Sequence, residues 1–215
     1  MKKTFTMLLL GCAALSALAG NRKENPFGPN VHIMYPSDDM TEIHNTVERI
    51  HTELFSEHFG SGRYAILFAP GDYRGAGLMK VPFYVHMAGL GRTPYEVILD
   101  NVHTPVHLAN DNGTCTFWRS IENLSVIGEE TYEEDEMFKW AVSQAAPIRR
   151  VYSERTVKNQ WKHGWVSGGF TADCHFKAPA GSDGQQQWYT RNSYLGKGRG
   201  EFREGSWNYM FQGVE

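Results

Sequence analysis

Cysteine is scarce in this sequence, as are long apolar runs and any strong excess of one charge. Three of the 215 residues are cysteine, and only Cys115 and Cys174 lie outside the N-terminal segment. The formal net charge of −3 argues against a general nucleic-acid binder. No apolar stretch after residue 20 is long enough to span a membrane. With 41% hydrophobic and 21% charged residues, the composition is neither disordered nor fibrous.

The N-terminal segment has the pattern of an export signal. Lys2 and Lys3 precede an apolar run that is too short to cross a bilayer, and Ala-Leu-Ala at 17–19 fits a small-x-small cleavage site. We therefore expect residues 1–20 to be a signal peptide and the protein to be secreted or periplasmic.

The mature chain, residues 21–215, is then one domain. Leu-Leu-Gly-Cys at 9–12 also resembles a lipobox, so a lipid anchor on Cys12 is the alternative to ordinary cleavage. The chain ends within a repeat, which predicts that the domain is incomplete at its C-terminus.

One amphipathic helix is expected early in this domain. Ser37 is a good N-cap, and Gly60 is a natural stop. Apolar residues then recur at spacings of three and four and form one stripe: Met40, Ile43, Val47, Ile50 and Leu54.

Short strands without room for helices follow this helix. They are expected at 63–69, 83–87 and 96–100. Such strands predict hairpins, a sandwich or a coil of parallel strands.

An internal repeat decides among these folds. Trp118, Trp140, Trp165, Trp188 and Trp207 are 22, 25, 23 and 19 residues apart. A second column begins at Asn123, Arg150, Asp173 and Asn192, at spacings of 27, 23 and 19. A period of this size, built from short strands, is typical of one turn of a solenoid. The repeat predicts an all-β, right-handed parallel β-helix with an N-terminal capping helix.

Alternation within the second column predicts which side chains point inward. The inward row is Leu124, Val151, Cys174 and Ser193, and the next is Val126, Ser153, Phe176 and Leu195. The outward wall carries Asn123, Arg150, Asp173 and Asn192, with Ser125, Tyr152, His175 and Tyr194 beside them. Turns stack ~4.8 Å apart, so Cys115 and Cys174 would lie roughly 10 Å apart, too far to bridge. We therefore expect two free thiols.

These features resemble the pectin-lyase-like group of right-handed parallel β-helices. The capping helix is followed by a strand that ends in a Pro-Gly-Asp-Tyr turn at 70–73, and then by a Gly-Leu-Gly turn at 89–91. Four further segments resemble a subfamily of secreted, glycan-active β-helix proteins without an assigned reaction: GPNVHI (28–33), AVSQAAPIRRV (141–151), SGGFTADC (167–174) and QQQWYTRNS (185–193). The resemblance implies a polysaccharide partner, but it carries over no catalytic set.

The outward wall is the predicted site, because stacked turns form a long groove for an extended polymer. The candidate catalytic residues are Asp173, His175 and Arg150. Candidate substrate-binding residues are Tyr152, Tyr194, Arg191, Asn192 and Trp188. Hydrolysis needs a second carboxylate, for which Glu122 and Asp100 are candidates. For the tryptophan column, packing in the core is the alternative to a sugar platform.

Two chemistries and two non-catalytic alternatives stay open. Residues 137–215 hold eleven Lys and Arg against six Asp and Glu, which suits an anionic glycan and a lyase. The acidic mature chain as a whole favours a glycoside hydrolase instead. A non-catalytic glycan-binding or adhesive β-helix, or an inactive fragment, would have the same pattern. No cofactor or metal is expected, although the acidic run at 129–136 could bind Ca²⁺. The oligomeric state is not readable from the sequence.

Overall fold

The computed structural model describes residues 25–129, 133, 135–162, 164–181, 185–196 and 208–215. It divides the chain into two compact units, Met1–Val31 and His32–Glu215. In the first unit the described residues 25–31 form a turn, in which Asn25 Oδ1 accepts a hydrogen bond from Phe27 N at 3.0 Å. The predicted signal peptide, the tryptophan at position 207 and half of the acidic run at 129–136 (residues 130–132 and 134) lie outside the described residues.

Parallel strands build the second unit. One sheet contains β1 (Val31–Met34), β2 (Tyr64–Phe68), β3 (Gly71–Asp72), β5 (Val85–Gly89), β6 (Val97–Leu99), β8 (Ser120–Val126), β10 (Pro147–Ser153), β12 (Val166–Ala172), β13 (His175–Gly181), β14 (Gln185–Arg191), β15 (Tyr194–Gly196) and β16 (Met210–Gln212). A second ladder contains β4 (Leu78–Lys80), β7 (Asn101–His103), β9 (Phe138–Lys139), β11 (Val157–Lys158) and the end of β13. Short 3₁₀ helices lie at Pro94–Glu96 (η1) and Ala109–Asp111 (η2).

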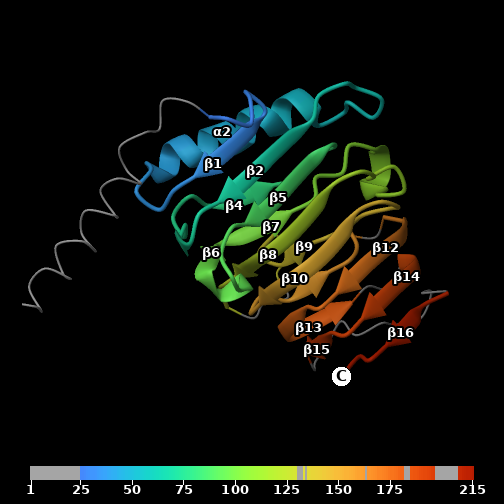
Figure 1. The fold of residues 1–215 in the computed structure, drawn as a ribbon. Coiled ribbons are helices and arrows are strands. Elements are labelled where there is room, and N and C mark those ends of the chain that lie inside the picture. The colour runs from blue at the N-terminus through green and yellow to red at the C-terminus, as the bar shows by residue number, and fades with distance from the viewer. Residues whose placement is uncertain (1–24, 130–132, 134, 163, 182–184, 197–207) are drawn as a thin grey trace, which may run out of the picture. The chain divides into compact units, whose positions relative to one another are not determined.

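The strands stack turn upon turn, as Figure 1 shows for β2, β5, β8 and β10. Within one turn β13 pairs with β10 at His175 and Phe176, and with β11 at Ala180 and Gly181. One strand therefore belongs to both ladders and carries the chain around the coil. The predicted parallel β-helix is confirmed.

The helix α2 (Met40–Leu54) lies across the N-terminal end of this stack (Figure 1). Its predicted apolar stripe is confirmed, because Ile43, Val47, Ile50 and Leu54 are at most 1% exposed. The predicted N-cap was wrong by two residues. Asp39 caps the helix, since its Oδ1 accepts N–H groups of Thr41 at 2.7 Å and Glu42 at 3.2 Å. The helix also ends at Leu54, before Gly60.

Two files of left-handed residues mark where the chain bends in successive turns. The first corner file is Tyr84, Trp118, Ala145, Gly168, Gln187 and Asn208. The second corner file is Asn123, Arg150, Asp173, Asn192 and Gly213. All of these residues have φ between 47° and 80°. From Trp118 onward, each member of the second file follows a member of the first by five residues. The two files therefore bracket one flat strand segment in every turn.

The register confirms the column that begins at Asn123 and corrects the tryptophan series. Val151 pairs with Leu124, Tyr152 with His175, and His175 with Tyr194, as the spacing predicted. Among the described tryptophans, however, no two share a file. Trp140 and Trp188 are buried, whereas Trp118 and Trp165 are 39% and 56% exposed. The repeat is therefore marked by the left-handed corner residues, and not by the tryptophans.

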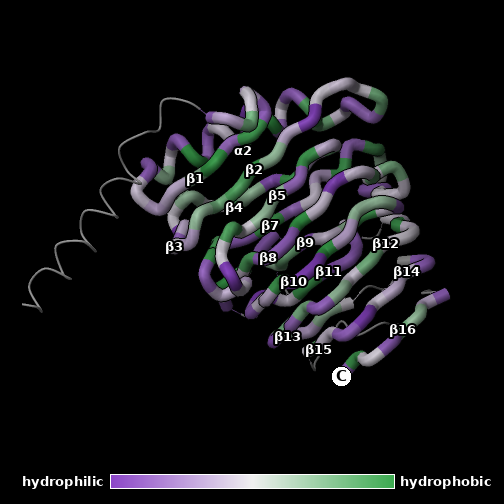
Figure 2. The backbone as a smooth tube through the Cα atoms, viewed as in Figure 1, coloured by the Kyte–Doolittle hydropathy of each residue, from purple (hydrophilic) through white to green (hydrophobic). Residues whose placement is uncertain are grey.

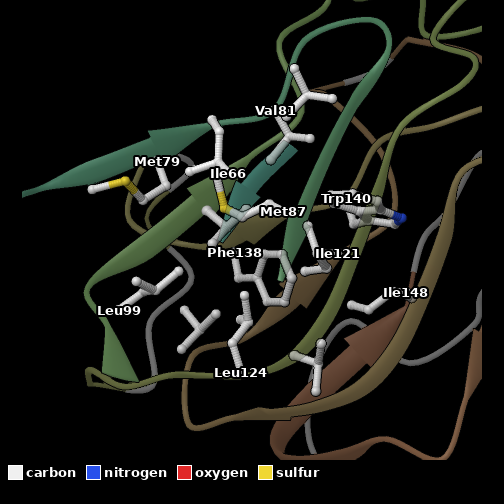
Figure 3. Packing of buried hydrophobic residues seen from close by; sticks show 14 of the residues in the cluster. Ile66, Met79, Val81, Met87, Leu99, Ile121, Leu124, Phe138, Trp140 and Ile148 are labelled. Carbon is white, nitrogen blue, oxygen red and sulfur yellow. The ribbon is translucent and has the colours of Figure 1, made fainter. Parts of the chain in front are cut away.

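Inward side chains from both ladders fill the coil (Figure 3). Along the strands, hydrophobic and hydrophilic residues alternate, as Figure 2 shows by colour. Met87, Ile121 and Ile148 form one inward file and are at most 1% exposed. In the next turns this file continues as Thr171 and Thr190. The core is therefore most apolar in the turns of β5, β8 and β10.

Cys115 and Cys174 are both free thiols, as predicted. The Cys174 thiol lies in the core and donates to Ala172 O at 3.2 Å. Burial raises the pKa of this thiol to about 12, so it stays protonated at neutral pH. In the described part of the chain, no helix has the length and apolar character needed to cross a membrane.

Candidate functional site

The flat segments between the two corner files form one outward surface, called here the front face. Alternation places one file on it near the first corner: His86, Ser120, Pro147, Phe170, Tyr189 and Met210. A second outward file lies near the second corner: Ala88, Glu122, Arg149, Ala172, Arg191 and Gln212. Most of these side chains reach solvent, whereas the residues between the two files, Met87, Ile121 and Ile148, are buried.

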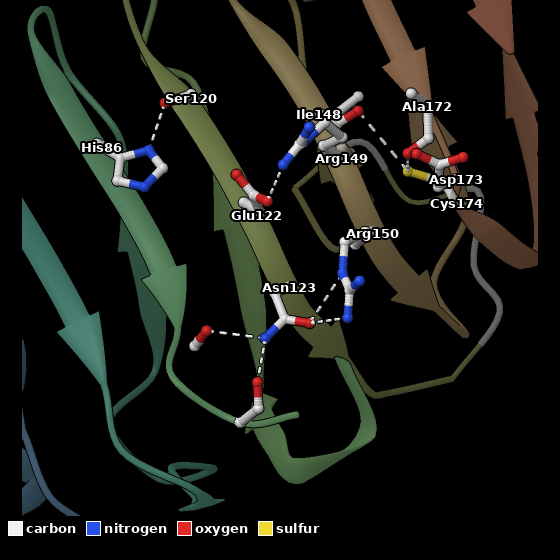
Figure 4. Close-up of polar contacts among 12 residues, drawn as sticks. His86, Ser120, Glu122, Asn123, Ile148, Arg149, Arg150, Ala172, Asp173 and Cys174 are labelled. Atoms are coloured by element: carbon white, nitrogen blue, oxygen red, sulfur yellow. Dashed lines mark hydrogen bonds and ion pairs between the residues drawn. The ribbon is translucent and has the colours of Figure 1, made fainter. Parts of the chain in front are cut away.

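A depression of about 320 Å³ interrupts the front face where the side chains are small. Ala88, Gly89 and Gly91 leave the space, and His86, Glu122, Asn123, Arg149 and Arg150 border it. We call this depression the trough; Figure 4 shows its polar side chains. Gly89 is required here, because a Cβ at this position would lie 2.1 Å from Asn123 O.

Charged groups in the trough are held in defined pairs. The Arg149 guanidinium forms a short ion pair with the Glu122 carboxylate one turn away (Figure 4). The hydrogen bond that Arg149 donates to that carboxylate raises the pKa of Arg149, and the charges of Glu122 and Asp173 add to the effect. Two carboxylates, Glu122 and Asp173, therefore act on one guanidinium.

The second corner file holds several of the predicted site residues. Asn123 Nδ2 donates to Gly89 O at 2.9 Å and to Gly91 O at 2.7 Å, and its Oδ1 accepts from Arg150 Nη2 at 3.1 Å. Asn123 is 8% exposed. It therefore lies beneath the outer surface, and not on the exposed wall that was predicted.

Further along the same file, Asp173 Oδ1 accepts from Asn192 Nδ2 at 3.3 Å. The other carboxylate oxygen lies 3.8 Å from Arg191 Nη2. The structure thus brings the predicted residues Asp173, Asn192 and Arg191 together, and Arg150 lies one turn before Asp173 in the same file.

An aromatic strip runs beside this corner. Ring centroids are 5.1 Å apart for Tyr95 and Tyr152, 5.4 Å for Tyr152 and His175, and 5.0 Å for His175 and Tyr194. Burial and the hydrogen bond to Glu154 raise the pKa of Tyr152 to about 12, which keeps its hydroxyl protonated. The structure therefore assembles the predicted Tyr152, His175 and Tyr194 into one continuous surface.

Sequence reasoning missed Tyr95 and misplaced Ser125. Ser125 is 1% exposed because η1 covers it, and its Oγ donates to Pro94 O at 2.8 Å. Tyr95 of η1 packs against Tyr152 instead, with the ring planes tilted by 55°. The aromatic side chain at position 95, between two predicted strands, was the available signal.

Trp188 does not lie on the outer surface, which corrects its prediction as a substrate-binding residue. It is 1% exposed, and its Nε1 donates to Thr171 Oγ1 at 3.2 Å. The reason is Gly169, one turn earlier, where a Cβ would lie 2.2 Å from the indole. The ring fills the space that the missing side chain leaves in the core.

Within the described residues, no group of three or more His, Cys, Asp and Glu side chains is arranged to hold a metal ion. His103 illustrates the point. It is buried, and its Nε2 lies 2.9 Å from Met137 O. Burial lowers the pKa of this imidazole to about 4, so it is a neutral structural group.

Comparison with known proteins identifies similar chains of greater length. No family model matches. An exo-β-1,3-glucanase from Streptomyces sp. strain SirexAA-E / ActE is 37% identical over 190 residues, which cover 87% of this chain and 29% of the glucanase.

Solved structures agree with this similarity. The structure of sacteLam55A from Streptomyces sp. SirexAA-E superposes with a TM-score of 0.74 at 34% identity, over 89% of this chain and 33% of that one. A single-residue variant of sacteLam55A in complex with glucose gives the same values. This chain therefore spans about a third of the length of the proteins it resembles, and it shares their fold over that part.

Proposed function

We propose that this chain is a glycan-active β-helix of the glycoside hydrolase type, with β-1,3-glucan as its substrate class. The observation that carries the proposal is the 37% identity, across 87% of this chain, to an exo-β-1,3-glucanase. The finer assignment to the pectin-lyase-like group, the signal peptide at 1–20 and export of the protein belong to the same proposal.

The site geometry supports a hydrolase over a lyase. A lyase needs a free cation to neutralise the uronate carboxylate and a free base. Here Arg149 is paired with Glu122 and Arg191 with Asp173, and the Arg150 guanidinium is held by hydrogen bonds to Asn123 Oδ1 and Arg92 O. The exposed aromatic rings of the strip offer flat apolar surfaces on which neutral sugar rings stack.

Two carboxylates are the natural reacting groups of this site. In glycoside hydrolysis one carboxylic acid protonates the leaving oxygen, and a second carboxylate attacks the sugar or activates water. Asp173 and Glu122, on either side of Arg149, would fill these roles. Arg150 and His175 would position the sugar, and Tyr152, Tyr194, Arg191 and Asn192 would bind it.

A non-catalytic glycan-binding role is the alternative. It is favoured by the ion pairs of both carboxylates, Glu122 with Arg149 and Asp173 with Arg191, because a paired carboxylate is a poor proton donor. The proposed role needs no cofactor or metal.

The test is an activity and binding panel on the 215-residue chain. Laminari-oligosaccharides, cello-oligosaccharides and polygalacturonate are incubated with the protein. Release of reducing ends and absorbance of unsaturated uronides are followed, and binding is measured by calorimetry. We expect reducing ends from the β-1,3-linked substrate and no unsaturated product.

The matched pair of variants is Asp173→Asn and Asp72→Asn. Both carboxylates are ion-paired to an arginine, with side chains 41% and 45% exposed. Loss of activity only in Asp173→Asn supports the site. Binding without product identifies the non-catalytic alternative, and failure to bind any β-1,3-glucan overturns the proposal.

A further inference from the structure

Planar side chains stack along the start of the first corner file. The Arg63 guanidinium carbon lies 3.4 Å from the ring centroid of Tyr84. The Tyr84 and Trp118 rings are nearly parallel, at 6°, with centroids 5.4 Å apart. Successive turns of the coil therefore hold a stack of three planar groups.

The two aromatic residues of the stack are held in an unfavourable backbone conformation. Tyr84 and Trp118 have φ of 60° and 52°, a region that costs bulky residues about 1–3 kcal/mol each. Their surroundings impose it: Tyr84 N donates to Trp118 O at 2.6 Å, and Tyr84 OH donates to His58 O at 2.8 Å. Phe117 also packs on Trp118, at 5.1 Å between centroids. The indole is thus pre-positioned before any ligand arrives.

The stack then stops abruptly. The next members of the first corner file are Ala145 and Gly168, which carry no ring. A depression of about 260 Å³ lies at this point, bordered by Tyr84, Trp118, Ala145, Pro147, His86 and Ser120. Trp118 is 39% exposed and Ala145 is exposed. The depression is therefore a space beside the indole where the next planar group is missing.

Polar groups border this space, and the charged residue among them, Arg119, is buried. His86 Nδ1 lies 2.7 Å from Ser120 Oγ (Figure 4). Arg119 also lines the depression, but its guanidinium is buried, packs on Phe83 at 4.5 Å and donates to Val81 O at 2.8 Å. A ring with one apolar face and hydroxyl groups at its edge matches this lining better than an ionic ligand.

We infer that the space beside Trp118 is a subsite for one hexopyranose ring of a neutral β-glucan. The apolar face of the sugar stacks on the indole above Ala145, and its hydroxyls reach His86 and Ser120. Because His86 also borders the trough, a glucan chain in this subsite continues directly into the trough. This inference rests on the proposed function and adds a place and a residue to it.

Two substitutions test the subsite from opposite directions. Trp118→Ala removes the platform. Ala145→Trp completes the stack with a side chain and fills the space, and its φ of 57° already matches that of Trp118 at 52°. Trp165→Ala is the matched control, because Trp165 is 56% exposed and borders neither depression.

The readouts are calorimetric affinity for laminari- and cello-oligosaccharides and the indole N–H signal of Trp118 in two-dimensional NMR. We expect the Trp118 signal to shift on addition of glucan, and both site variants to bind at least about tenfold more weakly. Trp165→Ala should bind like the wild type. If Trp118→Ala fails to fold, Ala145→Trp still decides, since it removes no native contact.

The outcomes separate this inference from the proposed function. If the wild type binds laminari-oligosaccharides but Ala145→Trp binds them equally well, the subsite is wrong and the proposed function stands. If only cello-oligosaccharides bind and shift Trp118, the subsite stands and the β-1,3 assignment falls. If no oligosaccharide shifts the Trp118 signal, the subsite is overturned.

Discussion

Asn123 shows how one side chain can connect three parts of the coil. Its amide donates to the carbonyls of Gly89 and Gly91 and accepts from Arg150, so it links the turns before and after its own. The residue is 8% exposed, and water cannot easily replace these partners. Asn192, in the same corner file, is exposed and makes a single longer side-chain bond to Asp173.

We expect Asn123→Asp to lower the free energy of unfolding by about 2–3 kcal/mol, because a carboxylate cannot donate to the two carbonyls it would face. Asn192→Asp, the same change in an exposed member of the file, should cost less, because solvent screens the repulsion that it adds beside Asp173. Urea unfolding of both variants measures the difference. Equal losses would show that burial of the amide is unimportant.

For single residues, the sequence predicted which positions align between turns better than it predicted the surroundings of each side chain. The column of Asn123, Arg150, Asp173 and Asn192 was found because polar residues recur there at turn-like spacing. Nothing in the sequence marked Trp118 as a corner residue, since Trp rarely adopts positive φ. Trp188 was misplaced because its burial depends on the absence of a side chain at Gly169, in a different turn.

The helix α2 covers the N-terminal end of the coil through one narrow stripe. Lys80 Nζ lies 3.0 Å from Glu48 Oε2, which ties the helix to β4 at the edge of that stripe. The stripe was predictable because helical spacing is a local property of the sequence. The cap was not, because Ser37 and Asp39 are both suitable and only the backbone path selects Asp39.

We expect Ile50→Ala to cost about 2–5 kcal/mol, because Ile50 is completely buried and the coil end cannot collapse around the cavity. Asn45→Ala, on the exposed side of the same helix, should change stability by less than about 0.5 kcal/mol. Thermal and urea unfolding report both. A loss of similar size in the two variants would mean that the stripe does not anchor the helix.

Across the whole second unit, packing weakens from the central turns toward β16. The inward residues Met87, Ile121 and Ile148 are at most 1% exposed, whereas Phe211, in the same inward file, is 47% exposed. In a solenoid each turn is stabilised by its neighbours, so local stability should follow this gradient.

We therefore expect amide hydrogen exchange to be slowest in β5, β8 and β10 and fastest in β16. Exchange followed by mass spectrometry on peptides that cover these strands is the measurement. Uniform protection from β5 to β16 would contradict the gradient. Addition of a glucan that binds should slow exchange mainly in β5, β8 and β10, whose residues border both depressions.

From Trp118 onward, the two corner files are always five residues apart, whereas the length of the rest of each turn varies. Spacings along the second corner file are 27, 23, 19 and 21 residues, so all of the variation in turn length falls outside this five-residue segment. Loops can therefore be lengthened, shortened or exchanged without shifting the flat strand segments of the front face. This makes the protein a suitable scaffold for grafting new loops around an unchanged front face.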